Sequence, residues 1–231
     1  MSKERPILFS GPMVRAILEG RKLQTRRIVK DAQSLPTVWT GDPDREAVPS
    51  WYSEEYCPYG KPGDRLWVRE TFWVRQWGNT INGIGVDYKA GGEPTHRSTR
   101  PDNVGQMCRW RPSIHMPRWA SRINLEITEV RVERLQDISE NDAYEEGVTL
   151  TVPEEQTYYG QFRVLWESIN GSCKRCKGHG VVPAWSGSLA AGLEQTANDC
   201  PECHGTVPGS WDANPFVWVI EFKHNGGGAN G

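Results

Sequence analysis

A run of apolar residues near the end of the chain, Phe216–Phe222, restricts the possible folds more than any other stretch. Its apolar side chains follow one another, whereas a strand with one face in water alternates apolar and polar residues. The sequence therefore predicts a β-strand that is buried on both faces or that closes a barrel.

The size and charge of the chain limit its partners. With 231 residues it can form one substantial core, or one domain with a smaller inserted unit. Its 27 Lys and Arg residues nearly balance 29 Asp and Glu residues, whereas a protein that binds polyanions over its whole surface is more basic. Any contact with nucleic acid must therefore be local.

The sequence contains neither a membrane-spanning run nor a secretion signal. No apolar stretch reaches the length of a transmembrane helix, and Met1–Pro6 lacks the apolar region of a signal peptide. We therefore expect no membrane partner and a cytoplasmic location, where cysteines stay reduced.

The first part of the chain predicts a strand, a helix and a second strand. Pro6–Phe9 is a short apolar strand, and the helix after it begins near Pro12 and is ended by Gly20. Residues 31–62 have little periodicity and predict a long surface loop. The turn Pro62–Asp64 then leads into an alternating strand.

Glu70 is the unusual residue of that alternating strand. It shares a face with Leu66, Val68 and Phe72, so its carboxylate is expected among apolar side chains. An unpaired carboxylate there is costly, and Lys22 is our candidate for its partner.

The second half of the chain predicts further strands and helices, with irregular loops at 91–109 and 110–119. A bulge is expected near Thr128–Glu129, because the apolar phase changes there. Ser139 and Asp142 form a helix-start pair, whose helix Gly147 ends. The other expected elements are a strand at Ile84–Lys89, a strand at Ile123–Val132, a helix at Pro153–Asn170 and a disordered tail from His224.

Four cysteines form two closely spaced pairs, Cys173 with Cys176 and Cys200 with Cys203. Two such pairs can close a tetrahedral four-thiolate zinc site, which leaves no open position and is therefore structural. Disulfides, or a histidine ligand from His179 or His204, are the alternatives. Cys57 and Cys108 lack this context and are expected to be small apolar residues.

The most cationic short stretch is Gly20–Arg27, which contains four basic side chains and one threonine. It is either a solvated basic edge or part of a functional cleft. A second group with arginine, histidine and tryptophan lies at 110–119, where it suits phosphate contact and base stacking. The remaining tryptophans, among them Trp67, Trp166 and Trp218, are assigned to the core.

These motifs together resemble the ASCH family of the PUA-like superfamily, in its longer phage and prophage form. The resemblance rests on Gly20-x-Lys22-x-x-Thr25-x-Arg27, on the strand with Gly63-Asp64-x-x-Trp67-Val68-x-Glu70, and on the terminal apolar strand. Segments 114–119, 165–170 and 214–218 are also similar, so the match covers most of 6–171 and 210–223. The cysteine pairs resemble half-repeats of the DnaJ cysteine-rich region.

The resemblance implies an α+β fold: a PUA-like β-barrel flanked by short helices, with a small zinc-binding insertion. The ASCH domain would comprise 1–171 and 210–231, and the inserted zinc hairpin 172–209. The host would be a bacterial or phage-infected cell. RNA, modified nucleic acid or a nucleoside would bind in the cleft.

Small bacterial members of the family hydrolyse the acyl amide of N4-acetylcytidine with a lysine, a threonine and a strand glutamate. The resemblance carries these roles to Lys22, Thr25 and Glu70. A neutral lysine could take the proton of the threonine nucleophile. Positions 22 and 25 face opposite ways in a straight strand, so a turn or bulge is needed between them. The expected binding residues are Arg21, Arg26, Arg27, Arg111, His115, Arg118 and Trp119.

Three functional hypotheses follow. The first is an amidohydrolase of an N4-acylated cytidine, and the second is a module that binds RNA or modified nucleic acid without chemistry. The third is a metal-independent ribonuclease. Thr25 could instead be an ordinary strand former, Glu70 a structural ion-pair partner and His115 a packed or hydrogen-bonded histidine.

Overall fold

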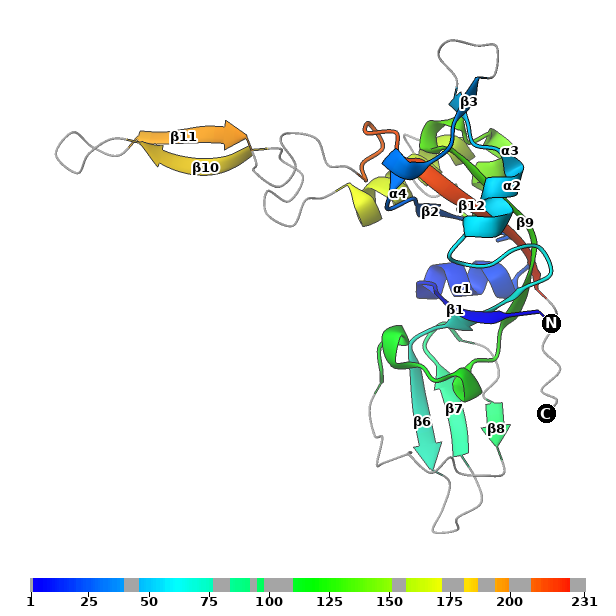
Figure 1. Ribbon diagram of the computed structural model, residues 1–231. Helices are drawn as coiled ribbons and strands as arrows, with labels where there is room; N and C mark the ends of the chain where they lie inside the picture. The colour runs from blue at the N-terminus through cyan, green and yellow to red at the C-terminus, as the bar shows by residue number, and fades with distance from the viewer. Residues whose placement is uncertain are drawn as a thin grey trace.

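The computed structural model describes residues 2–39, 46–76, 84–91, 95–97, 110–150, 157–171, 181–186, 194–199 and 209–224. The expected disordered tail after His224 lies outside these ranges. Within them the protein has an α+β fold built on a mixed five-stranded sheet with a few helices (Figure 1).

The main sheet has the strand order β1-β5-β9-β12-β2. β1 and β5 pair in parallel, and the other neighbours pair antiparallel. Among the described strands β1 and β2 are the two edges, so this sheet is open rather than closed into a barrel. The strands are β1 (Glu4–Leu8), β2 (Gln24–Ile28), β5 (Arg65–Arg69), β9 (Asn124–Arg134) and β12 (Phe216–His224).

The prediction that the last strand is buried on both faces is confirmed. β12 lies between β9 and β2, and residues 216–220 are all buried. Trp218 and Ile220 point into one apolar cluster, while Val217 and Val219 point into another on the opposite face. Because both faces of the strand are covered, its sequence does not alternate.

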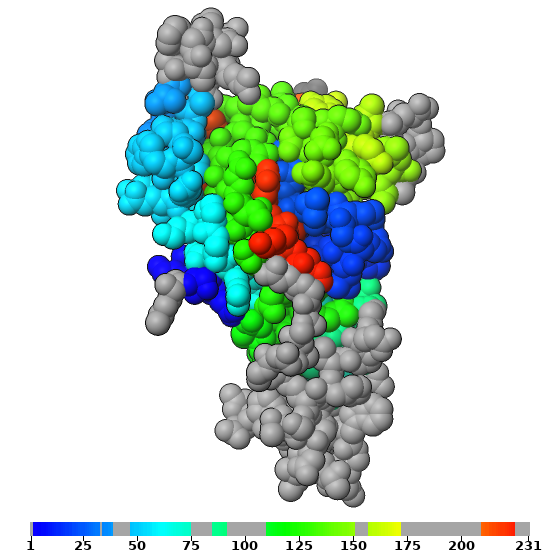
Figure 2. Space-filling model, turned by 90° about the vertical axis from the view of Figure 1, so that its right-hand side faces the viewer, coloured from blue at the N-terminus to red at the C-terminus, as the bar shows by residue number. Residues whose placement is uncertain are grey.

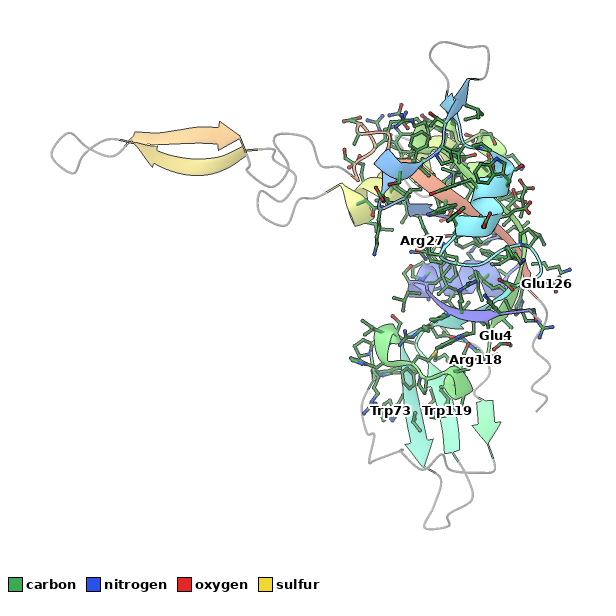
Figure 3. The ribbon with its side chains drawn as sticks, in the orientation of Figure 1. Glu4, Arg27, Trp73, Arg118, Trp119 and Glu126 are labelled. Atoms are coloured by element: carbon green, nitrogen blue, oxygen red, sulfur yellow. The ribbon has the colours of Figure 1, made fainter. Side chains whose placement is uncertain are left out.

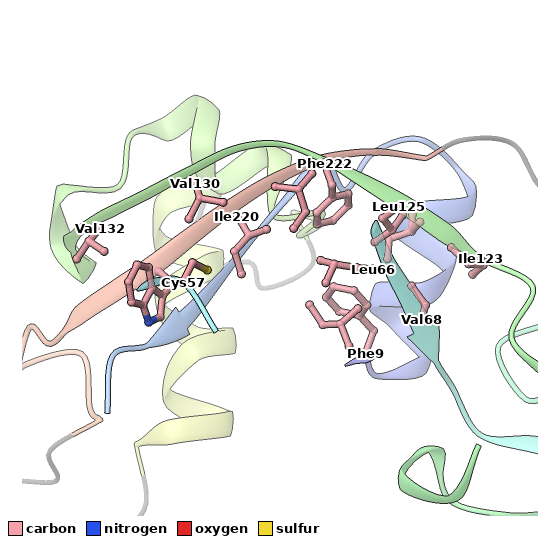
Figure 4. Packing of buried hydrophobic residues seen from close by; sticks show 14 of the residues in the cluster. Phe9, Cys57, Leu66, Val68, Ile123, Leu125, Val130, Val132, Ile220 and Phe222 are labelled. Atoms are coloured by element: carbon pink, nitrogen blue, oxygen red, sulfur yellow. The ribbon is translucent and has the colours of Figure 1, made fainter. Parts of the chain in front are cut away.

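The first cluster lies between the sheet and α1 (Gly11–Leu18). Figure 4 shows Phe9, Leu66, Leu125 and Phe222 converging there. The predicted helix is confirmed, and Gly20 after it has a φ of 72°, a conformation that glycine adopts without strain.

The second cluster lies under α3 (Glu140–Glu145) and α4 (Tyr158–Asn170). Ser139 and Asp142 form the expected capping box. The helix expected from Pro153 begins at Tyr158, after the cap residue Thr157, and residues 151–156 lie outside the described ranges.

The expected bulge is also confirmed. Glu221 pairs with Glu129, and the next residue, Phe222, pairs with Ile127, so Thr128 has no partner in the register. The extra residue changes the phase of the buried side chains along β9, as the apolar pattern requires.

The strand predicted through Glu70 is in fact two strands in different sheets. β5 ends at Arg69, and β6 (Phe72–Gln76) pairs with β7 (Ile84–Tyr88), which pairs with β8 (Thr95–Arg97). The four residues predicted to be buried are buried nonetheless, Glu70 included. This second sheet has a core of its own with Met116.

Two loop predictions were wrong in part. Residues 31–62 contain α2 (Ser50–Tyr56), a 3-10 turn η1 (Ala32–Ser34) and the pair β3 (Val38–Trp39) and β4 (Glu46–Ala47). β8 lies inside the loop expected at 91–109, whereas 110–119 is irregular as expected, with the 3-10 turns η2 (Ser113–His115) and η3 (Arg118–Ala120). After β9 comes a third short turn, η4 (Leu135–Asp137).

Between α4 and β12, the strands β10 (Val181–Ser186) and β11 (Glu194–Asp199) form an antiparallel pair. Within the described ranges, no helix is both long and apolar enough to cross a membrane.

Candidate functional site

The basic stretch joins α1 to the edge strand β2. Lys22 precedes the strand and forms an isolated bridge with Glu146, and regular pairing with β12 begins at Gln24. Lys22 and Arg26 both contact Glu146, so Lys22 points to the same side of this stretch as Arg26 and away from the side of Thr25.

Lys22 is buried against the segment that follows α3. Its Nζ lies 2.7 Å from Oε2 of Glu146 and 2.7 Å from the carbonyl oxygen of the same residue. Burial lowers the pKa of Lys22 from its ordinary 10.5; Glu146 opposes this shift, and the charges of Arg27 and Arg26 add to it. The ammonium thus has one close carboxylate and two cationic neighbours.

Glu70 pairs with Arg122, so the prediction of Lys22 as its partner was wrong. The guanidinium lies 2.9 Å from Oε1 and 3.1 Å from Oε2, in a two-point contact. Burial raises the pKa of Glu70, although Arg122 opposes the shift. The cause of the error is the end of β5 at Arg69, because the chain then turns toward the second sheet.

Arg122 packs over the ring of Tyr88 at 3.9 Å from the ring centroid. It thereby links Glu70 to the second sheet. The sequence analysis did not identify Arg122 as a partner of Glu70, because no motif distinguishes it from the other arginines that lie next to apolar strands.

Arg26 is buried and is held by carboxylates. Its guanidinium lies 2.6 Å from Glu133 and 3.2 Å from Oε1 of Glu146. This geometry gives Arg26 a role inside the fold, apart from any surface that could contact a polyanion. The neighbouring Gln24 donates to the carbonyl and side chain of Asp142 on α3.

Arg131 extends this network toward the surface. It contacts Glu221 and lies 3.2 Å from both Glu133 and Asp142. Sequence reasoning missed these carboxylates, because they come from three separate elements.

Thr25 and Arg27 lie on the opposite face of β2 from Gln24 and Arg26, as alternation requires. Arg27 donates to the carbonyl of Leu8 at 2.7 Å and lies 5.4 Å from the ring centroid of Phe9. The Lys22 Nζ lies 5.6 Å from the same ring. Phe9 therefore has both cations beside it, while Thr25 is buried opposite Ile220.

A second group of cations surrounds Trp67. The guanidinium of Arg69 lies 5.5 Å from this ring and that of Arg118 lies 5.9 Å from it. Arg118 also pairs with Glu4 at 2.9 Å, and Figure 3 shows these two side chains close together. Trp67 is half-buried, so its assignment to the core was wrong, whereas Trp166 and Trp218 are core residues.

The backbone at the end of β1 contacts an arginine of each group. Arg27 donates to the carbonyl of Leu8, and the amide of Phe9 donates to the carbonyl of Arg69. We call Arg27, Arg69, Arg118 and Trp67 the arginine face. The Nε atoms of Arg27 and Arg69 are buried and have no hydrogen-bond acceptor among the described residues.

The other predicted binding residues lie in different settings. His115 is exposed on η2, so it is not the packed histidine that we considered. Arg111 pairs through its backbone with Phe72, and Trp119 packs on the core of the second sheet. Arg21 contacts Glu19 and the carbonyl of Gly147, away from the arginine face.

The four cysteines of the expected zinc site, Cys173, Cys176, Cys200 and Cys203, lie outside the described residues, as do Cys108, His179 and His204. The β10–β11 register pairs Val181 with Asp199. No three or more metal-binding side chains cluster within the described ranges. Cys57 is buried and unbonded, as expected of a small apolar residue.

We compared the chain with protein-family models, with curated proteins and with solved structures. None of the three comparisons gives a match.

Proposed function

We propose that this protein recognises a nucleic acid or a nucleoside through its arginine face. The observation that carries the proposal is the placement of Arg69 and Arg118 beside the half-buried ring of Trp67, with their guanidinium groups 5.5 Å and 5.9 Å from its centroid.

Aromatic side chains beside these cations support the same proposal. Trp67 offers a ring next to Arg69 and Arg118, and Trp110, which is 43% exposed, lies edge-on to Trp73 at 5.7 Å. Arginines bind phosphates, and tryptophan rings stack on bases. The overall charge of −2 is compatible with contact at a local patch of this kind.

The ASCH resemblance supports the same class of partner. The proposed location is the cytoplasm, because Met1–Pro6 lacks the apolar region of a signal peptide. There the clustered cysteines would stay reduced and bind zinc. In this proposal the zinc has a structural role and takes no part in chemistry.

Binding is tested by fluorescence anisotropy with labelled single-stranded RNA and DNA over a salt series. We expect affinity to fall steeply with salt, and Arg69→Gln and Arg118→Gln each to reduce the logarithmic slope by about one. Arg163→Gln, at an exposed position on α4, is the matched control and should change little. Failure to bind any RNA or DNA at low salt would remove the proposal.

A second candidate function is hydrolysis of an N4-acylated cytidine, and the lowered pKa of Lys22 favours it. A neutral Lys22 amine would take the proton of the Thr25 hydroxyl, which would attack the amide carbonyl. The C–N bond would break with protonation of the amine of cytidine, and water would then release the acyl group from Thr25. Glu146 would orient Lys22, because it is the carboxylate in contact with it.

Incubation with N4-acetylcytidine, with detection of cytidine and acetate, tests this second function. Thr25→Val should abolish turnover, while Thr128→Val, at the exposed bulge of β9, should not. Glu70→Gln tests the role carried over from the resemblance. No turnover by the wild type would exclude hydrolysis, and cleavage of bound RNA would indicate the ribonuclease instead.

A further inference from the structure

A cavity of about 470 Å³ lies between α1 and α4, and none of the residues discussed for catalysis lines it. Its walls come from α1, from the segment after α3 and from α4. In Figure 2 the blue residues of α1 and the stretch after it lie beneath yellow-green residues from the region of α3 and α4. This volume falls within the range of about 300–1,000 Å³ of small-molecule sites.

The walls of the cavity are mainly apolar. Met13 projects from α1, Val148 from the segment after α3, and Val164 and Leu165 from α4. Val164 is 42% exposed, so an apolar side chain borders the cavity without being covered by the described fold. A ligand with an apolar body would cover the Val164 side chain, and removal of both apolar surfaces from water would favour binding.

The polar groups at the rim are not balanced in charge. Arg21 and Glu19 satisfy one another, with the Arg21 Nε 2.9 Å from the carboxylate. Ser168 is also satisfied, because its hydroxyl donates to the carbonyl of Leu165. Arg15 also lines the cavity, and it forms no ion pair with any described residue.

We propose that this cavity binds a small monocarboxylate with an apolar body. The apolar walls accept the body, and the Arg15 guanidinium pairs with the carboxylate, for which its fork of donors is suited. Because Glu19 and Arg21 pair with one another, Arg15 gives the cavity one net positive charge, and this charge favours an anionic ligand. This site is separate from the arginine face, and the proposal does not depend on the proposed function.

The test uses octanoate as the probe, with binding to the full-length protein measured by titration calorimetry. Octanamide keeps the apolar body without the charge, and acetate keeps the charge without the body. We expect saturable binding of octanoate, and binding of octanamide and acetate that is weaker by about tenfold or more.

Variants locate the site. Arg15→Gln should weaken octanoate binding by about tenfold or more, because it removes a charge-assisted contact. Val164→Asp places a negative charge at the cavity and should also weaken it, whereas Arg163→Gln, one residue away on the same helix, should not. Both of these positions are exposed, so neither substitution disturbs the core.

Three outcomes would overturn the proposal. They are the absence of saturable octanoate binding, equal affinity for octanoate and octanamide, and unchanged affinity in both Arg15→Gln and Val164→Asp. The last outcome would assign the binding to another apolar surface, such as the exposed Trp51 and Tyr56 of α2.

Discussion

The ammonium of Lys22 and the carboxylate of Glu146 form an ion pair inside the protein, with 2.7 Å between Nζ and Oε2 and side-chain exposures of 2% and 5%. The other carboxylate oxygen accepts from Arg26 at 3.2 Å. Glu146 therefore satisfies two buried cations, and it joins the end of α3 to the stretch that connects α1 with β2.

Glu146→Gln should destabilise the protein by about 3–5 kcal/mol, because it leaves Lys22 and Arg26 without a shared counter-charge. Glu145→Gln, at the neighbouring half-buried position, is the control and should cost less than about 1 kcal/mol. Denaturant unfolding measures both values. Equal losses in the two variants would show that the ion pair contributes little.

The same variant should respond to pH in a defined direction. Without Glu146, burial lowers the pKa of Lys22 further, so the unfolded chain binds more protons than the folded one below the ordinary pKa of 10.5. Stability then rises with pH, and the deficit of Glu146→Gln should be smaller at about pH 9 than at about pH 7. A deficit that grows over this interval would contradict the assignment.

Arg122→Met and Arg118→Met compare a buried ion pair with an exposed one at the same distance. Both arginines lie 2.9 Å from a carboxylate, but the side chains of Arg122 and Glu70 are 10% and 2% exposed, against 42% and 41% for Arg118 and Glu4. We expect a loss of about 3–5 kcal/mol for Arg122→Met and about 0–1 kcal/mol for Arg118→Met in thermal or denaturant unfolding.

The pH dependence of Arg122→Met provides a second check. Burial already raises the pKa of Glu70, and loss of the arginine raises it further. The folded state then binds more protons than the unfolded one above the ordinary pKa of 4.5, so stability falls as pH rises through that interval. The deficit should be smaller near pH 5 than near pH 8, and a constant deficit would indicate lost packing alone.

Gly147→Ala and Gly20→Ala separate backbone strain from crowding. Both glycines have positive φ, 79° and 72°, so each alanine should cost about 1–2 kcal/mol in strain. A Cβ at Gly147 would also lie 2.8 Å from the Cβ atoms of Ala16 and Lys22, whereas one at Gly20 would meet nothing within 4 Å. Gly147→Ala should therefore be worse by a further 1–3 kcal/mol or so, and equal costs would contradict the packing described.

Asp64 should stabilise the fold in a pH-dependent way. Burial raises its pKa, but the amides of Lys3 and Lys61 and the charge of Arg5 outweigh burial, so the pKa is lowered from its ordinary 3.8. The stabilisation is complete above that value and is lost as pH falls through the folded-state pKa. The difference in unfolding free energy between wild type and Asp64→Asn should therefore shrink as pH falls below 3.8; a constant difference would contradict this prediction.

The zinc site is tested by metal analysis of the purified protein. We expect one zinc per chain, lost when Cys173→Ser is combined with Cys200→Ser, since the proposed site takes all four of its ligands from cysteine thiolates. Cys57→Ala should retain the metal, because that thiol is buried in the main core. Zinc that persists without Cys173 and Cys200 would disprove the four-cysteine assignment.

Local signals predicted much of the fold. The helix that Gly20 ends, the capping box of Ser139 and the bulge at Thr128 depend on neighbouring residues, and all were found from the sequence. The predicted burial of Glu70 was also correct, because Glu70 continues the every-second-residue pattern of the buried Leu66 and Val68.

The ion-pair partners could not be predicted in the same way. Lys22 and Glu146 are 124 residues apart in the chain, and Arg122 and Glu70 are 52 apart. Which residues pair depends on which helices and strands pack together. The neighbouring residues do not distinguish these arginines and glutamates from several others in the sequence. Motif spacing suggested that Lys22 and Glu70 share a site, but it contains no information on which ions touch.

The position of β12 affects how the chain can fold as it is synthesised. β2 emerges early from the ribosome, yet among the described strands its hydrogen-bonding partner is β12, which is translated after every other one. Until then the inner edges of β2 and β9 are unprotected, and closing so long a loop is slow. A nascent chain of this kind would depend on chaperones that shield strand edges, and shortening β12 would release protein prone to aggregate.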